Sequence, residues 1–83
     1  MSDTSTVEVH LFAAARAAVG ESSVSVEPGT LGSVLDELCT RFPAFVAVRP
    51  RCSFLLDEVS CVDASAAINA GSRVDVLPPF AGG

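Results

Sequence analysis

Hydrophobic and polar residues alternate along several short segments of the chain, a pattern that is typical of half-buried β-strands. The first segment covers residues 7–12, where Val7, Val9 and Leu11 share one face. The second covers residues 22–27 and also carries valines on one face. The two segments are close enough to form an antiparallel hairpin, although their connection is too long for a tight turn.

Two helices are predicted next to these strands. The alanine-rich residues 13–19 indicate a short helical turn that ends at Gly20. A longer amphipathic helix is expected after Thr30, which stands at the N-cap position. Its apolar residues follow the spacing i, i+3, i+4, i+7, i+8 and i+11 and are Leu31, Val34, Leu35, Leu38, Cys39 and Phe42. Pro43 ends the helix, and Ser33 at the third helical position is not the Glu or Gln of a full capping box.

The second half of the chain predicts three more strands. Residues 44–51 indicate a loop or a short turn of helix. Residues 53–56 and 59–62 look like two short strands, residues 64–71 like a connection with room for one helical turn, and residues 73–77 like a final strand. The predicted order is β-β-α-β-β-β, an α+β domain in which one main helix covers one face of a mixed sheet.

The composition is that of a small globular protein. Eighty-three residues are enough for one domain, and a hydrophobic content of 49% excludes intrinsic disorder. No apolar run is long enough to span a membrane. The polar residues 1–6 lack the features of a signal peptide and are interpreted as a disordered leader of a cytoplasmic protein. Residues 7–77 form the predicted domain, and residues 78–83 form an extended C-terminal tail.

The charge balance excludes further classes of protein. Five arginines and no lysine stand against ten acidic residues, which gives a net charge of −5. The arginines form no dense cluster, so nucleic-acid binding is not expected, and an acidic protein is suited to a partner with a basic surface. Without lysine the chain offers no side-chain amine for isopeptide attachment or Schiff-base chemistry.

The cysteines and the single histidine do not form a recognisable metal site. Cys39, Cys52 and Cys61 are widely spaced without a C-x-x-C pair, and His10 is the only histidine. The cysteines are interpreted as small buried hydrophobic residues in a reducing compartment. His10 alternates with core positions, so we expect it on the solvent side or at an interface.

The C-terminal tail carries the candidate chemistry. The chain ends in Leu77-Pro78-Pro79-Phe80-Ala81-Gly82-Gly83. Two prolines favour a stiff, extended segment, and glycines without Cβ atoms can enter a narrow channel. The functional group delivered at the tip is the α-carboxylate of Gly83, which becomes reactive once it is activated as an acyl-adenylate. The competing interpretation is a frayed chain end without function.

The tail and three other segments resemble the ubiquitin-like β-grasp sulfur carriers, specifically the MoaD-type small subunits of molybdopterin synthase. The resemblance covers residues 7–83, and the tail is similar to the family's apolar–Pro–Pro–apolar–small–Gly–Gly ending. Residues 12–20, Phe-Ala-Ala-Ala-Arg-Ala-Ala-Val-Gly, look like the family's F-A-x-x-R-E-x-x-G segment. Thr30 at the start of the helix and Gly71 before the last strand also match, whereas Phe80 is larger than the family's usual Val or Ile.

The resemblance implies a role in molybdenum cofactor biosynthesis. An E1-like activating enzyme would adenylate Gly83 with ATP, and a sulfur donor would convert the adenylate to a thiocarboxylate (1-thioglycine). A MoaE-type large catalytic subunit would take up the tail, and the thiocarboxylate would supply sulfur to cyclic pyranopterin monophosphate to form the molybdopterin dithiolene. The chain would be the non-catalytic, sulfur-donating subunit of a heterotetrameric sulfurtransferase, with no permanently bound cofactor and no metal.

Several side chains are candidates for binding that partner. Pro78, Pro79, Ala81 and Gly82 belong to the inserted tail, and Phe80 is expected to fill a partner pocket or to fold back onto its own sheet. Arg16 matches a family position and is expected either to pair with a partner carboxylate or to be a plain surface arginine. The polar side of the long helix, Asp36 and Glu37, is interpreted as its solvated face.

Three alternative functions remain open at this point. The chain could be a sulfur carrier for thiamine or cysteine biosynthesis, although the Pro-Pro pair argues against the thiamine type. It could be a ubiquitin-like modifier that is conjugated through Gly83 to lysines of target proteins. It could also be a plain interaction module with an inert tail.

Overall fold

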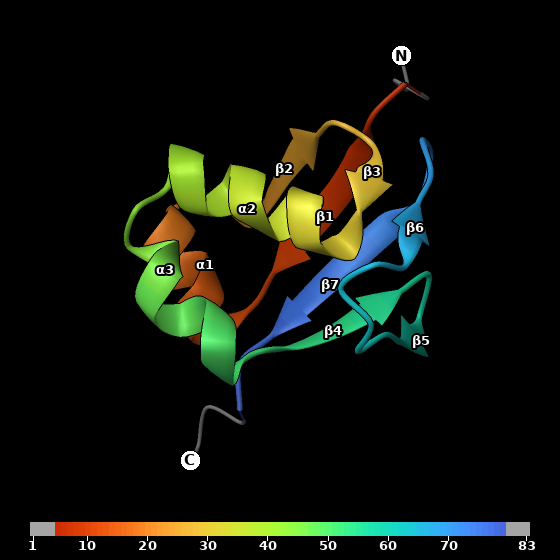
Figure 1. The fold of residues 1–83 in the computed structure, drawn as a ribbon. Coiled ribbons are helices and arrows are strands. Elements are labelled where there is room, and N and C mark those ends of the chain that lie inside the picture. The colour runs from red at the N-terminus through yellow and green to blue at the C-terminus, as the bar shows by residue number, and fades with distance from the viewer. Residues whose placement is uncertain (1–4, 80–83) are drawn as a thin grey trace.

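A mixed β-sheet forms one layer of the protein (Figure 1). The computed structural model describes residues 5–79. The strands of the sheet are β1 (Val7–Leu11), β2 (Ser23–Val26), β4 (Ser53–Leu56), β5 (Val59–Ser60) and β7 (Arg73–Leu77). Their order is β2-β1-β7-β4-β5, in which β1 and β7 are parallel and the other neighbours are antiparallel. The first and last strands thus lie side by side, and the predicted α+β architecture is confirmed.

The helices of the described residues are α1 (Ala13–Val19), α2 (Leu31–Arg41), α3 (Phe45–Val48) and the 3-10 helix η1 (Arg49–Arg51). Helix α2 crosses one face of the sheet, and α1 and α3 lie together beside it (Figure 1). Gly20 ends α1 in the left-handed conformation, with its N–H donating to the carbonyl of Arg16 at 2.8 Å. The glycine stop expected from the sequence is therefore present.

The apolar stripe of α2 forms the helical side of the core. Leu31, Val34, Leu35 and Leu38 are buried, whereas Cys39 and Phe42 are partly buried against the same cluster. The sheet contributes the alternate positions of β1 and β7, which are Val7, Val9, Leu11, Val74 and Val76. The apolar residues that recur every 3.6 positions on the helix and every 2 positions on the strands therefore face one core, as the sequence predicted.

Helix α2 begins with a complete capping box. The Oγ1 of Thr30 accepts a hydrogen bond from the N–H of Ser33 at 3.1 Å, and the Oγ of Ser33 accepts one from the N–H of Thr30 at 2.9 Å. The expectation that the box would lack its second half is wrong, because a serine hydroxyl at this position reaches the same backbone donor.

The N-cap is expected to contribute measurably to stability. Replacing Thr30 with Ala removes the acceptor of the Ser33 N–H and should lower the free energy of unfolding by about 1 kcal/mol. Urea unfolding followed by circular dichroism measures the change. Thr40→Ala is the matched control, since Thr40 is exposed near the other end of α2. Equal midpoints for the two variants would contradict the role of the cap.

The second half of the chain differs from the sequence-based prediction in three places. Residues 44–51 form α3 and η1, which is more helix than the single turn considered. The strand predicted over residues 59–62 ends at Ser60. The connection at residues 64–71 contains β6 (Ala67–Ile68), which pairs with β3 (Gly29–Thr30) in a separate small sheet. Each of these two strands has only two residues, which is too short to show the alternation by which a strand is predicted from a sequence.

The β4–β5 hairpin closes through a two-residue turn. Asp57 and Glu58 have φ values of 48° and 72°, which is the left-handed pair of a type I′ turn. The Asp57 carboxylate also accepts a hydrogen bond from the N–H of Arg73 at 2.9 Å. An aspartate suits this position because it tolerates the left-handed region and bonds to nearby backbone.

Candidate functional site: the tail exit

The last described residues leave the sheet from the end of its central strand. Leu77 ends β7 and pairs with Ser53 of β4, while on the other side the N–H of Phe12 donates to the carbonyl of Val76 at 3.3 Å. We call this end of the domain the tail exit and define it by Phe12, Arg51, Leu77, Pro78 and Pro79. A strand held on both edges gives the segment that follows a fixed starting point.

The structure describes the predicted tail residues as far as Pro79. Pro78 is half-buried and Pro79 is exposed. Phe80, Ala81, Gly82 and Gly83 lie outside the described residues, so their predicted roles stay predictions.

Arg16 is exposed on α1, and its side chain makes no hydrogen bond or ion pair within residues 5–79. Helix α1 follows β1 at the end of the sheet where β7 also ends, and it packs beside α3. Arg16 therefore has a free guanidinium for a partner carboxylate, but its binding role stays a prediction.

Phe12 is part of the tail exit and was not predicted as a site residue. Its side chain is 40% exposed next to the end of β7. Directly after it, Ala13 has φ 49°, in the left-handed region that alanine rarely enters. This sharp change of direction separates β1 from α1 and leaves an aromatic ring at the surface beside the tail. The sequence did contain a signal for Phe12, because Phe12 is the first residue of the segment 12–20 that resembles the family's F-A-x-x-R-E-x-x-G pattern.

The face of the sheet opposite α2 carries a polar row at its centre. Asp75 on β7 is only 6% exposed, and its Oδ1 accepts a hydrogen bond from the Nε of Arg73 at 2.7 Å, which raises the pKa of Arg73. His10 on β1 lies next to Asp75 in the parallel register. Its Nε2 is 3.3 Å from the Oε1 of Glu8 without hydrogen-bond geometry, and it has no other partner among the described residues. His10 is thus on the outer face, as the alternation predicted.

The acidic residues of α2 hold two arginines. The Nη1 of Arg49 donates to Asp36 Oδ1 at 2.7 Å, and this bond is the main reason that the pKa of Arg49 is raised. Arg41 is 3.6 Å from Glu37 and also donates to the carbonyl of Ser25 at 2.9 Å, on edge strand β2. The sequence pattern had suggested that Asp36 and Glu37 are only the solvated face of the helix. In the structure each of the two carboxylates also pairs with an arginine.

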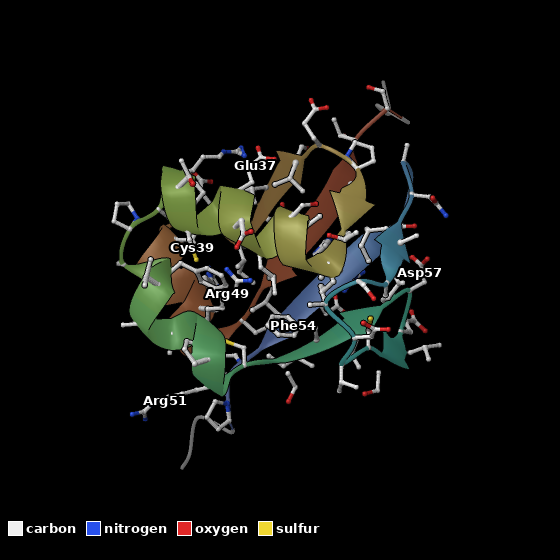
Figure 2. All side chains as sticks on the ribbon, viewed as in Figure 1. Glu37, Cys39, Arg49, Arg51, Phe54 and Asp57 are labelled. Carbon is white, nitrogen blue, oxygen red and sulfur yellow. The ribbon has the colours of Figure 1, made fainter. Side chains whose placement is uncertain are left out.

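The three cysteines are half-buried rather than fully buried. The Cys52 thiol donates to the carbonyl of Val48 at 3.3 Å, and burial raises the pKa of the thiol. The Nη1 of Arg49 lies 3.6 Å from Cys39 Sγ, and Figure 2 shows these two side chains pointing toward each other between α2 and η1. Within residues 5–79 no three His, Cys, Asp or Glu side chains gather in a way that could hold a metal ion.

None of the helices in this same range has the length and hydrophobicity needed to cross a membrane.

Comparison with known proteins places the chain in a family. The sequence profile of the ThiS family matches residues 9–83, which is nearly the whole chain. The chain belongs to the ThiS family. It is also 36% identical to the molybdopterin synthase sulfur carrier subunit of Aedes aegypti, over 93% of this chain and 88% of that protein. The resemblance to MoaD-type subunits is therefore confirmed.

Solved structures share the fold of this ThiS family member. SAMP1 from Haloferax volcanii superposes with a TM-score of 0.82 at 26% identity, covering 94% of this chain and 99% of SAMP1. A chain in the complex of subunits 1 and 2 of molybdopterin-converting factor from Helicobacter pylori superposes with a TM-score of 0.71 at 19% identity, covering 94% of this chain and 99% of that chain. The expected ubiquitin-like β-grasp fold is confirmed.

Proposed function

We propose that this chain is a sulfur carrier of the ThiS/MoaD type that works as the small subunit of molybdopterin synthase. The observation that carries the proposal is the tail exit. There a Pro-Pro segment leaves the central strand of a β-grasp domain, and in the sequence it leads to Gly-Gly. The 36% identity to the mosquito sulfur carrier subunit supports the pathway. In this reading the domain is the part that partners recognise, and the tail is the part that reacts.

The proposed chemistry takes place at the Gly83 carboxylate. A carboxylate oxygen attacks the α-phosphorus of ATP on an activating enzyme, pyrophosphate leaves, and an acyl-adenylate forms. A hydrosulfide ion from the sulfur donor then attacks the carbonyl carbon, AMP leaves with the electron pair of the broken C–O bond, and loss of the S–H proton to water leaves the thiocarboxylate. This thiocarboxylate supplies sulfur to cyclic pyranopterin monophosphate, with the catalytic side chains supplied by the large subunit.

The described residues prepare this chemistry by positioning the tail. Leu77 is fixed between β1 and β4, and the proline φ restraint at Pro78 and Pro79 limits the directions that the chain can take from there. A pre-ordered segment loses less conformational entropy when a partner binds it. The exposed ring of Phe12 and the unpaired guanidinium of Arg16 provide contacts beside it.

A protein partner is part of the proposal. The Helicobacter pylori structure is a complex of two subunits of molybdopterin-converting factor, which supports a protein partner for this related chain. We propose a MoaE-type large subunit and a heterotetramer with this chain at each end, and an E1-like enzyme as the second partner. Specific complexes of this kind bury about 1,600 Å² in total.

Phe80 is expected to be an anchor of that complex. Truncation of Phe80 to Ala should leave a partner pocket empty and weaken binding to the large subunit by roughly 2 kcal/mol, as hot-spot truncations do. Titration calorimetry against the large subunit measures the change. Val59→Ala is the control, because Val59 is an exposed apolar residue that lies across from the other end of β7. Equal affinities of the wild type and Phe80→Ala would assign recognition to the sheet face.

The mass of the intact protein from cells tests the proposed function. A thiocarboxylate makes the chain heavier than the free acid by the difference between sulfur and oxygen. Co-expression with the sulfur-activating machinery should produce this species, and it should disappear when cyclic pyranopterin monophosphate and the large subunit are added. A chain that is recovered only as free acid or as protein conjugates would overturn the proposal.

A protein-modifier function is the second candidate. It is favoured by the similarity to SAMP1, a small archaeal modifier protein. In that case the intact-mass experiment would detect amide-linked adducts of Gly83 to lysines of other proteins. Sulfur carriers for thiamine or cysteine biosynthesis would carry the same thiocarboxylate but would not respond to the pyranopterin substrate.

A further inference from the structure

Strand β2 is one of the two open edges of the main sheet. The strand order β2-β1-β7-β4-β5 places β2 at one end and β5 at the other (Figure 1). An open edge presents backbone N–H and C=O groups that can pair with a strand of another chain. Strand β5 has only two residues, whereas β2 has four. Because very short edge strands are poor templates for pairing, β2 is the edge that is long enough to accept a further strand.

The pairing of β2 with β1 shows which backbone groups of β2 point away from the sheet. The N–H of Leu11 donates to the carbonyl of Ser22 at 2.9 Å. In an antiparallel pair, residues that bond to the neighbouring strand alternate with residues whose backbone groups point away from it. Counting from Ser22, the residues whose backbone groups point outward are Ser23, Ser25 and, directly after the strand, Glu27. A strand added at this edge would pair with these residues.

Two side chains of α2 already bond to this outward row. The Nη1 and Nη2 of Arg41 both donate to the carbonyl of Ser25, at 2.9 and 3.1 Å. The Oε1 of Glu37 accepts a hydrogen bond from the N–H of Glu27 at 3.3 Å, and Figure 2 shows Glu37 where α2 passes β2. Glu37 and Arg41 are also 3.6 Å apart as an i,i+4 ion pair, so each helps to hold the other in place. We call Glu37 and Arg41 the edge pair.

Strand β2 lacks the features that protect many edge strands. Its sequence is Ser-Val-Ser-Val, without a proline or a charged residue. Charged side chains, prolines and bulges are the usual devices that keep a second strand away, and small serine side chains do not obstruct its approach. The edge pair on α2 therefore supplies the protection that other edge strands carry in their own sequence.

We propose that the edge pair closes the β2 edge against strand addition by a second copy of this chain. Two β2 strands related by a two-fold axis present the same outward groups to each other, so a second copy is a matching partner for this edge. With the edge pair in place, the Ser25 carbonyl and the Glu27 N–H are already bonded, and pairing would first have to break these contacts. The edge pair therefore keeps the chain a monomer. The inference does not depend on the chemistry proposed for the C-terminal carboxylate.

The test compares the wild type with the double variant Glu37→Ala/Arg41→Ala. The two substitutions remove one negative and one positive charge, so the net charge stays at −5. Sedimentation velocity over a series of concentrations measures the dimer dissociation constant, at physiological ionic strength so that repulsion between two acidic chains is screened. We expect the wild type to remain monomeric. The double variant should dimerise with a dissociation constant at least about tenfold lower than that of the wild type, because two more backbone groups per chain become free to pair.

Two further variants locate the contact. Asp36→Ala/Arg49→Ala is the matched control, because it also preserves the net charge but removes an ion pair that joins α2 to η1 instead of β2. This control should remain monomeric. Adding Ser25→Pro to the double variant should restore the monomer, because it removes an outward N–H of β2. Proline is tolerated on an edge strand where the N–H faces away from the sheet.

Circular dichroism verifies that each variant is folded. Arg41→Ala alone is a milder second variant, for which we expect a dissociation constant between those of the wild type and the double variant. Single and double variants that both stay monomeric would overturn the proposal. Dimerisation of the Asp36→Ala/Arg49→Ala control to the same extent would also contradict it, as would a dimer that Ser25→Pro leaves intact, since the contact would then lie elsewhere.

Discussion

Deletion of Gly83 is expected to abolish sulfur transfer while leaving the folded domain unchanged. In the proposed function the α-carboxylate of Gly83 is the group that becomes adenylated and then carries sulfur. Without Gly83 the carboxylate belongs to Gly82, one residue short of the position in which the partner active site would meet it. One extra residue after Gly83 should have the same effect, because it converts the reactive carboxylate into an internal amide.

The measurement is molybdopterin formation by the reconstituted two-subunit enzyme, combined with the thermal midpoint of the isolated chain. The midpoint should stay at the wild-type value, since β7 ends at Leu77 and the buried core lies within the described domain. Thr40→Ala, on the exposed side of α2, serves as a variant that should retain full transfer. Full molybdopterin formation by the deleted chain would show that Gly83 is not the carrier.

The second large effect concerns the core. Leu38 lies on the apolar stripe of α2 and is completely buried. Leu38→Ala should lower the free energy of unfolding by roughly 2–5 kcal/mol, the range for buried leucine truncations that leave a cavity. A domain of this length has a total stability on the order of 4–12 kcal/mol, so the variant is expected to lose a large share of its stability.

Urea unfolding of Leu38→Ala and of Val62→Ala distinguishes a core effect from a general one. Val62 is 93% exposed, and truncating it should change stability by about 0.5 kcal/mol or less. A Leu38→Ala midpoint as close to the wild type as that of Val62→Ala would mean that the α2 stripe is not the centre of the core. The sulfur-transfer experiment above would be unaffected by this outcome, because it depends on the tail.

The sequence was most informative where structure depends on neighbouring residues. The α2 stripe, its start at Thr30 and the glycine stop at Gly20 could be predicted because helical periodicity, caps and left-handed glycine are local properties. The alternation along β1 and β7 was equally visible, since the side-chain period of a strand is local. The Pro-Pro-x-x-Gly-Gly tail, the basis of the proposed function, was also recognisable before any fold was known.

Only the tertiary structure determined what depends on residues that are distant in the sequence. Asp75 lies on the face of β7 opposite Val74 and Val76, yet it is only 6% exposed and accepts a hydrogen bond from the Nε of Arg73. The β3–β6 pair could not be predicted because each strand has two residues and its partner lies more than thirty positions away. The same holds for the tail exit, where the central place of β7 brings together Phe12, Arg51 and Leu77 from three parts of the chain. Strand order is chosen by the packing of the whole sheet, and local patterns contain no information about it.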